Sequence, residues 1–84
     1  MKFLQHFINQ KVQMITGDEL LKYAEGFDIP LKREEAERIA SRLRRKKVDL
    51  FNEYERESLL REIAIITNEQ TAKKLSKLLT MFHS

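Results

Sequence analysis

Residues 34–47 read EEAERIASRLRRKK, and this stretch decides the fold of the chain. Its apolar residues recur three and four positions apart, the spacing of one face of a helix; they are Ala36, Ile39, Ala40 and Leu43. Acidic residues begin the stretch and basic residues end it, so both ends complement the helix dipole. The pattern predicts an amphipathic helix over about 32–46, whose apolar face needs other helices to cover it.

Upstream, Thr16-Gly17-Asp18-Glu19 forms a capping box, in which the Thr16 and Glu19 side chains bind each other's backbone amides. This motif predicts a helix over 17–26, with Gly26 as its left-handed C-cap. Pro30 separates this helix from the next, because the residue before a proline favours an extended backbone. A first helix over 2–11 is indicated by apolar residues at helical spacing, namely Phe3, Leu4, Phe7 and Ile8.

Downstream, Asn52 is an N-cap residue before a predicted helix over 53–66. Thr67 and Gln70 form a second capping box, which predicts a break and a last helix over about 68–82. Only two glycines and one proline interrupt a chain of 84 residues. The sequence therefore predicts one all-α domain over 1–84, an irregular compact bundle of about five short helices joined by short connections.

Composition limits the classes of function. The chain has no cysteine, so disulfides and thiolate metal sites are excluded. No apolar run approaches the ~20 residues of a membrane span, and polar residues interrupt the N-terminal segment too early for a signal peptide. We expect a cytoplasmic protein with no membrane partner. Its net charge of +3 favours nucleic acid or an acidic protein as partner.

No arrangement of residues indicates catalysis. His6 and His83 lie near opposite ends of the chain, without the paired spacing of a metal site. The serines lack a nucleophile motif, and the two glycines, Gly17 and Gly26, form no phosphate-binding loop. We therefore expect no catalytic residue, no metal, no cofactor and no small-molecule substrate, and a protein that is not an enzyme.

The basic run is the main candidate for a binding site. On a helical wheel Arg38, Arg42 and Arg45 fall opposite the apolar stripe, where they would face solvent, and Arg44, Lys46 and Lys47 flank them. Cations spaced along such a ridge can neutralise successive phosphates of nucleic acid. An acidic protein surface would be attracted in the same way. The alternative is that these cations only satisfy the last carbonyls of the helix.

The terminal helices supply a second candidate, a protein interface or homodimer contact. It comprises apolar residues that exceed what a small core can bury, namely Phe3, Phe7, Leu79, Met81 and Phe82. If they are exposed together, they form an apolar patch of the kind that marks an interface. The alternative is that the phenylalanines are core residues, a group that would also include Phe27 and Phe51.

Three stretches carry a resemblance to a known family: residues 15–24 (ITGDELLKYA), 35–40 (EAERIA) and 66–72 (ITNEQTA). In these the chain resembles a family of small uncharacterised proteins from Bacillus-type Gram-positive bacteria. The resemblance covers most of the chain and rests on helix caps and core stripes. It implies a cytoplasmic bacterial protein and assigns no functional residue.

Overall fold

The computed structural model describes residues 2–80, with the side chains of residues 3–77. This range contains five helices and no strand: α1 (Lys2–Gln13), α2 (Gly17–Gly26), α3 (Arg33–Arg45), α4 (Glu53–Ile66) and α5 (Glu69–Thr80). The predicted all-α fold is confirmed, and the predicted helix limits agree with these to within two residues. The predicted end of the last helix, at residue 82, lies outside the described residues.

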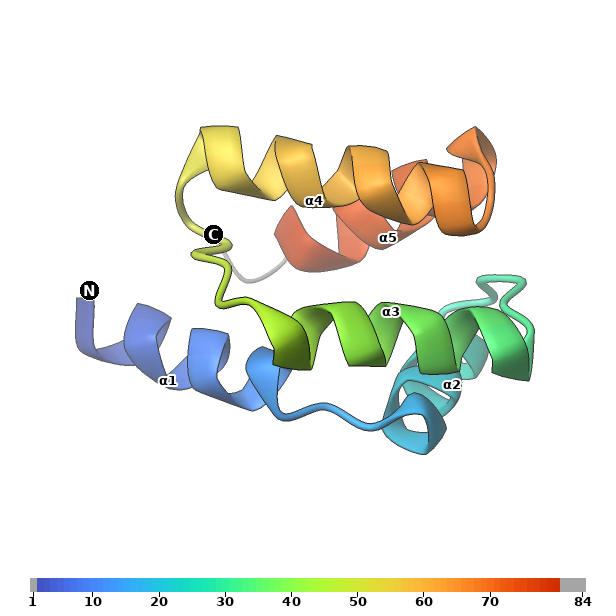
Figure 1. The fold of residues 1–84 in the computed structure, drawn as a ribbon, viewed down its shortest axis with the longest axis horizontal. Helices are drawn as coiled ribbons and strands as arrows, with labels where there is room; N and C mark the ends of the chain where they lie inside the picture. Colours follow the sequence, from blue (N-terminus) through green and yellow to red (C-terminus); the bar gives the residue numbers. More distant parts are fainter. Residues whose placement is uncertain (1, 81–84) are drawn as a thin grey trace.

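The helices form two layers, with α1, α2 and α3 on one side and α4 and α5 on the other (Figure 1). Helix α3 packs most extensively on α2, and α4 on α5. Helices α3 and α4 lie against each other across the layers and run in opposite directions. The candidate binding surface lies along this antiparallel pair of helices.

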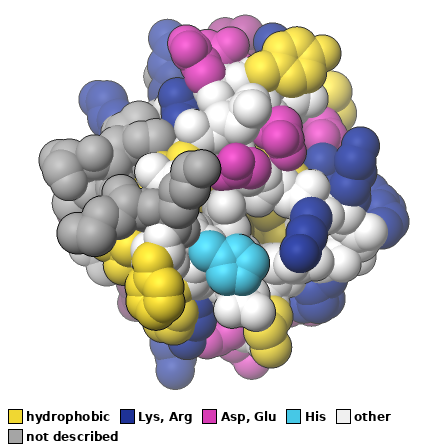
Figure 2. Space-filling view, turned by 90° about the vertical axis from the view of Figure 1, so that its left-hand side faces the viewer, with side chains coloured by type: hydrophobic (Ala, Val, Ile, Leu, Met, Phe, Trp, Pro, Cys, Tyr) yellow, Lys and Arg dark blue, Asp and Glu magenta, His cyan; other side chains and the backbone are white. Residues whose placement is uncertain are grey.

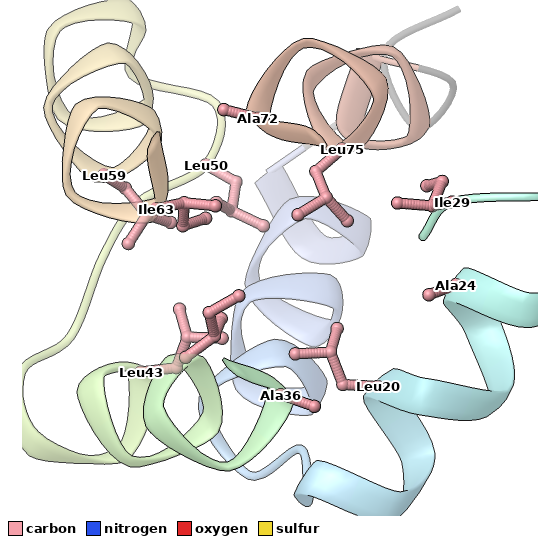
Figure 3. Packing of buried hydrophobic residues seen from close by; sticks show 11 residues of the cluster. Leu20, Ala24, Ile29, Ala36, Leu43, Leu50, Leu59, Ile63, Ala72 and Leu75 are labelled. Carbon is pink, nitrogen blue, oxygen red and sulfur yellow. The ribbon is translucent and has the colours of Figure 1, made fainter. Parts of the chain in front are cut away.

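The core fills the space between the two layers (Figure 3). The whole predicted stripe of α3 is buried. It packs in one apolar cluster with residues of the other helices and of the connections between them. The buried cluster comprises Leu20, Ala24, Ile29, Ala36, Ile39, Leu43, Leu50, Leu59, Ile63, Ala72 and Leu75. Burial of each larger aliphatic side chain contributes about 1.5–3 kcal/mol, so this cluster accounts for the cohesion of the layers.

Two predicted caps are present. The Thr16 hydroxyl accepts from the Glu19 amide at 3.1 Å, and the Glu19 carboxylate accepts from the Thr16 amide at 3.0 Å. The Asn52 side chain accepts from the Glu55 amide at 3.0 Å. Both helices therefore begin where their sequences indicate, because these side chains satisfy amides that have no partner inside the helix.

The predicted C-cap at Gly26 is wrong. Helix α2 includes Gly26, and the residue in the left-handed region is Asp28, with a φ of 56°. The Ile29 amide donates to the Ala24 carbonyl at 2.8 Å, and the Asp28 amide donates to the Glu25 carbonyl at 3.2 Å. These are the two hydrogen bonds of a Schellman motif, closed two residues later than expected because Ile29 can then bury its side chain beside Ala24.

The predicted capping box of Thr67 and Gln70 is also wrong. The Thr67 hydroxyl donates to the Ile63 carbonyl at 2.7 Å, which closes the last turn of α4. The N-cap of α5 is the next residue, Asn68, whose side-chain oxygen accepts from the Thr71 amide at 2.8 Å. Asparagine is the stronger N-cap residue, so it takes the start of α5 and leaves the threonine to the end of α4.

The aromatic residues are mostly outside the core, contrary to one of the two interpretations offered above. The exposed fractions of Phe3, Phe7 and Phe27 are 88%, 54% and 48%. Phe51 is half-buried and packs against the core, and Phe82 lies outside the described residues. Leucine, isoleucine and alanine side chains already fill the narrow space between the layers, so the larger rings lie at its margins.

Candidate binding surface

The six cations of the basic run do not share one environment. Arg38, Arg44, Arg45, Lys46 and Lys47 are exposed, whereas Arg42 is mostly buried. The buried stripe of α3 fixes the rotation of the whole helix, and Arg38 and Arg45 line its side on which α4 packs. The predicted solvent-facing ridge is therefore interrupted in its middle.

Arg42 is the residue that departs from the expectation. Its side chain is only 12% exposed, and its guanidinium binds both carboxylate oxygens of Glu62 on α4, at 2.7 and 2.8 Å. A third hydrogen bond runs from Arg42 Nη1 to the Lys46 carbonyl at 3.3 Å. The prediction that Arg42 faces solvent is wrong, because α4 packs along this flank of α3 and brings an acidic partner from 20 residues away.

Each residue of this pair stabilises the charged form of the other. The hydrogen bond from Arg42 lowers the pKa of Glu62 below its ordinary value of 4.5, with partial desolvation acting in the opposite direction. The hydrogen bond from Glu62 likewise raises the pKa of Arg42. Arg45 and Lys46 also lower the pKa of Glu62, by smaller electrostatic effects, so three cations of the basic run act on this carboxylate.

Arg44 also has a structural contact. Its Nη1 atom donates to the Ile15 carbonyl at 3.1 Å, which ties the end of α3 to the connection between α1 and α2. Arg42 therefore binds a carbonyl at the end of its own helix, as the alternative interpretation expected, whereas the carbonyl that Arg44 binds belongs to the connection between α1 and α2. Among the described residues, Arg38, Arg45, Lys46 and Lys47 form no ion pair.

A groove of about 490 Å³ lies between α3 and α4. Five residues of α3 and three of α4 line it: Glu37, Arg38, Ser41, Arg42, Arg45, Glu62, Ile65 and Ile66. The Arg42–Glu62 pair crosses the groove, with Arg38 and Arg45 on either side of it along α3. Ile65 is 83% exposed, so an apolar side chain projects beside these cations.

Sequence analysis named three of the eight residues that line this groove, and Glu62 and Ile65 are the most important of those that it missed. Glu62 carries no local signal, because its partner is on another helix. Ile65 could have been found, since it falls outside the apolar stripe of its helix, which comprises Leu59, Leu60, Ile63 and Ile66. A single exposed isoleucine is ordinary on a protein surface, so its position beside the cations, which only the structure shows, is what draws attention to it.

A second hollow, of about 250 Å³, lies between α1 and the connection from α3 to α4. His6, Lys47, Asp49 and Glu55 are among its lining residues. The end of the molecule seen in Figure 2 carries Lys and Arg side chains on several of its edges, with acidic side chains among them and a histidine near the middle of the view. Within the described chain no group of three or more metal-binding side chains comes together.

The predicted terminal interface is only partly visible. Phe3 and Phe7 lie on the same side of α1 and are exposed, as is Leu4. Met81 and Phe82, and the side chain of Leu79, lie outside the described residues. The structure therefore places two of the five predicted interface residues at the surface of α1.

The fold and this surface define a small all-α protein with a cationic helix end beside a two-helix groove. The chain belongs to the family described as "Protein of unknown function (DUF2624)", which matches residues 1–83. It is similar to "Uncharacterized protein YqfT" of Bacillus subtilis (strain 168), at 38% identity over 84 residues, the whole of both chains. The resemblance drawn from the helix caps and core stripes is confirmed.

No solved structure matches the chain. None of the described helices is both long enough and apolar enough to cross a membrane.

Proposed function

We propose that this chain is a non-enzymatic binding module that contacts nucleic-acid phosphates through the basic end, defined here as Arg44, Arg45, Lys46 and Lys47. One observation carries the proposal: these four consecutive cations are all exposed at the end of α3, and none forms an ion pair among the described residues. A cluster of this kind attracts polyanions and releases counterions from the phosphates that it neutralises.

The contact that we propose is with the phosphate backbone and not with bases. Three of the four cations lie at or beyond the last helical residue, Arg45, so they lack the rigid helical spacing that base readout uses. The proposed contact also excludes Arg42, whose donors are occupied by Glu62 and the Lys46 carbonyl. Arg42 instead supports the basic end by holding the last turn of α3 against α4.

Binding to a generic DNA duplex and a generic RNA duplex, measured over a series of salt concentrations, tests this proposal. The triple variant Arg45→Ala/Lys46→Ala/Lys47→Ala should bind more weakly and reduce the slope of log K against log salt by about 2–3. The matched control is Lys22→Ala/Lys73→Ala/Lys74→Ala, which removes the same charge from exposed positions on α2 and α5. Equal losses in both variants, or no binding at low salt, would contradict the proposal.

A second candidate function is a protein interface on α1, and the exposure of Phe3 and Phe7 favours it. Aromatic side chains are enriched in interfaces, and these two lie one helical turn apart. The simplest form is a homodimer. Sedimentation equilibrium should detect a dimer that Phe3→Ser/Phe7→Ser weakens and Tyr54→Ser, at an exposed position on α4, leaves unchanged. A strict monomer at high concentration would rule out this form.

A further inference from the structure

The groove between α3 and α4 has a composition that suits a different ligand from the basic end. Its cations, Arg38 and Arg45, are seven residues apart on α3 and form no ion pair among the described residues. The Arg42–Glu62 pair lies between them along α3 and is already neutralised, and the exposed Ile65 of α4 lines the same groove. Two separated positive charges therefore lie on either side of a neutralised ion pair, and Glu37 is the one further charged residue that lines the groove.

We propose that this groove binds an acidic amphipathic helix of a partner protein. The partner would place two carboxylates seven residues apart, one on Arg38 and one on Arg45, and apolar side chains between them on Ile65 and Ile66. Helices bind in grooves of this kind through residues at the third, fourth and seventh positions. The proposal does not depend on nucleic-acid binding by the basic end.

The spacing of the two arginines favours a helix over an extended peptide. Seven residues of α3 span about 10.5 Å, or two helical turns, and a second helix lying along α3 repeats that spacing on one face. An extended peptide rises about 3.3 Å per residue and alternates its side chains, so same-face carboxylates fall about 6.6 or 13 Å apart. Neither of these distances matches the rise of about 10.5 Å that separates Arg38 from Arg45 along α3.

The acidic residues in the groove favour a protein over nucleic acid. Glu37 and Glu62 both line it, and a phosphate backbone carries a charge at every nucleotide. A continuous row of phosphates would have some of its charges beside Glu37 and beside the already neutralised Arg42–Glu62 pair, with only two unpaired arginines to contact. A helix can instead place neutral side chains there, so it gains the two arginine contacts without like-charge repulsion.

The probe is a synthetic alanine-based peptide of about 15 residues, the length at which isolated helices begin to form. It carries glutamates seven positions apart and leucines at the third and fourth positions between them. A control peptide of the same composition has one glutamate moved to the opposite face. Fluorescence anisotropy of the labelled peptides, titrated with the full chain, gives the affinities.

The unmodified chain should bind the probe and should bind the control peptide more weakly. Arg38→Glu and Ile65→Asp should each weaken probe binding by about tenfold or more, since each removes an attractive contact and adds a carboxylate. The matched controls are Lys22→Glu and Tyr54→Asp, at exposed positions outside the groove, and they should leave the affinity unchanged. Circular dichroism establishes that all four variants are folded.

Three results would overturn the proposal: no binding of the probe, equal binding of both peptides, or equal losses in groove and control variants. Duplex DNA binding separates it from the proposed function. Ile65→Asp should leave DNA binding and its salt dependence intact, whereas the basic-end triple variant should reduce them. A loss of DNA binding in Ile65→Asp would assign the groove to nucleic acid and would also overturn the proposal.

Discussion

The guanidinium of Arg42 on α3 and the carboxylate of Glu62 on α4 form a two-point ion pair, with nitrogen–oxygen distances of 2.7 and 2.8 Å. The two helices belong to different layers, so the pair links the layers at the edge of the core (Figure 1). Two-point pairs of this type fix orientation as well as distance. Arg42 is therefore a structural residue in the middle of a basic run.

The Glu62→Gln variant should be less stable than the unmodified chain at pH 7, by about 0.5–1 kcal/mol, the range for partly exposed pairs. Arg42 lowers the pKa of Glu62 in the folded state below its ordinary value of 4.5. A lowered folded pKa means stability that is present above pH 4.5 and lost as the pH falls through the folded value. The difference between the two proteins should therefore shrink in acid.

Urea unfolding of both proteins at pH 7 and at acidic pH values below 4.5 measures this difference. Glu57→Gln is a suitable control, because Glu57 is exposed on the same helix and forms no ion pair among the described residues. A Glu62→Gln deficit that stays constant from pH 7 into acid would show that the carboxylate charge is not the source of the stabilisation.

The side chain of Asn9 holds α1 to the connection between α3 and α4. Its Nδ2 atom donates to Asp49 at 3.0 Å, and its Oδ1 atom accepts from the Leu50 amide at 3.0 Å. Asn9→Asp keeps the acceptor but replaces the donor with a second negative charge beside Asp49. We expect it to destabilise the chain by about 1–2 kcal/mol.

The exchanged pair Asn9→Asp/Asp49→Asn provides the control for this prediction. It restores one donor facing one carboxylate, so it should recover much of the stability that Asn9→Asp loses. Thermal unfolding followed by circular dichroism measures both. If the double variant is no more stable than Asn9→Asp alone, the two side chains are not coupled as the structure indicates.

Asp28→Gly should stabilise the chain by about 0.5–1 kcal/mol. Asp28 has a φ of 56°, a conformation that glycine adopts without the steric penalty of a Cβ atom. The change also removes a negative charge from the C-terminal end of α2, where the helix dipole is negative. Denaturant midpoints compare it with Glu25→Gly, which places glycine inside α2 and should destabilise by about 1 kcal/mol.

Ala36→Leu should destabilise the chain by about 1–3 kcal/mol, because an enlarged side chain has no space there. Ala36 has no exposed surface, and Figure 3 shows its methyl group beside Leu20, where α2 and α3 pack. Ser41→Leu on the exposed side of the same helix should change stability little. Equal unfolding midpoints for the two variants would mean that α2 and α3 are not closely packed at this point.

The helices themselves were predictable because their signals are local. The stripe from Ala36 to Leu43 and the caps at Thr16 and Asn52 act within one or two helical turns, and each is found where the sequence places it. The two errors at helix ends, at Gly26 and Thr67, arose where adjacent residues competed for the same role. Burial of Ile29 and the stronger capping of Asn68 decided those cases.

The sequence by itself determined that this chain forms five amphipathic helices and that α3 ends in a run of cations, because spacing and charge are properties of contiguous residues. Only the tertiary structure decided which cations are available. The packing of α4 against α3 brought Glu62 to Arg42, and the connection before α2 brought the Ile15 carbonyl to Arg44. Such contacts join residues that are far apart in the chain, so no local sequence pattern predicts them.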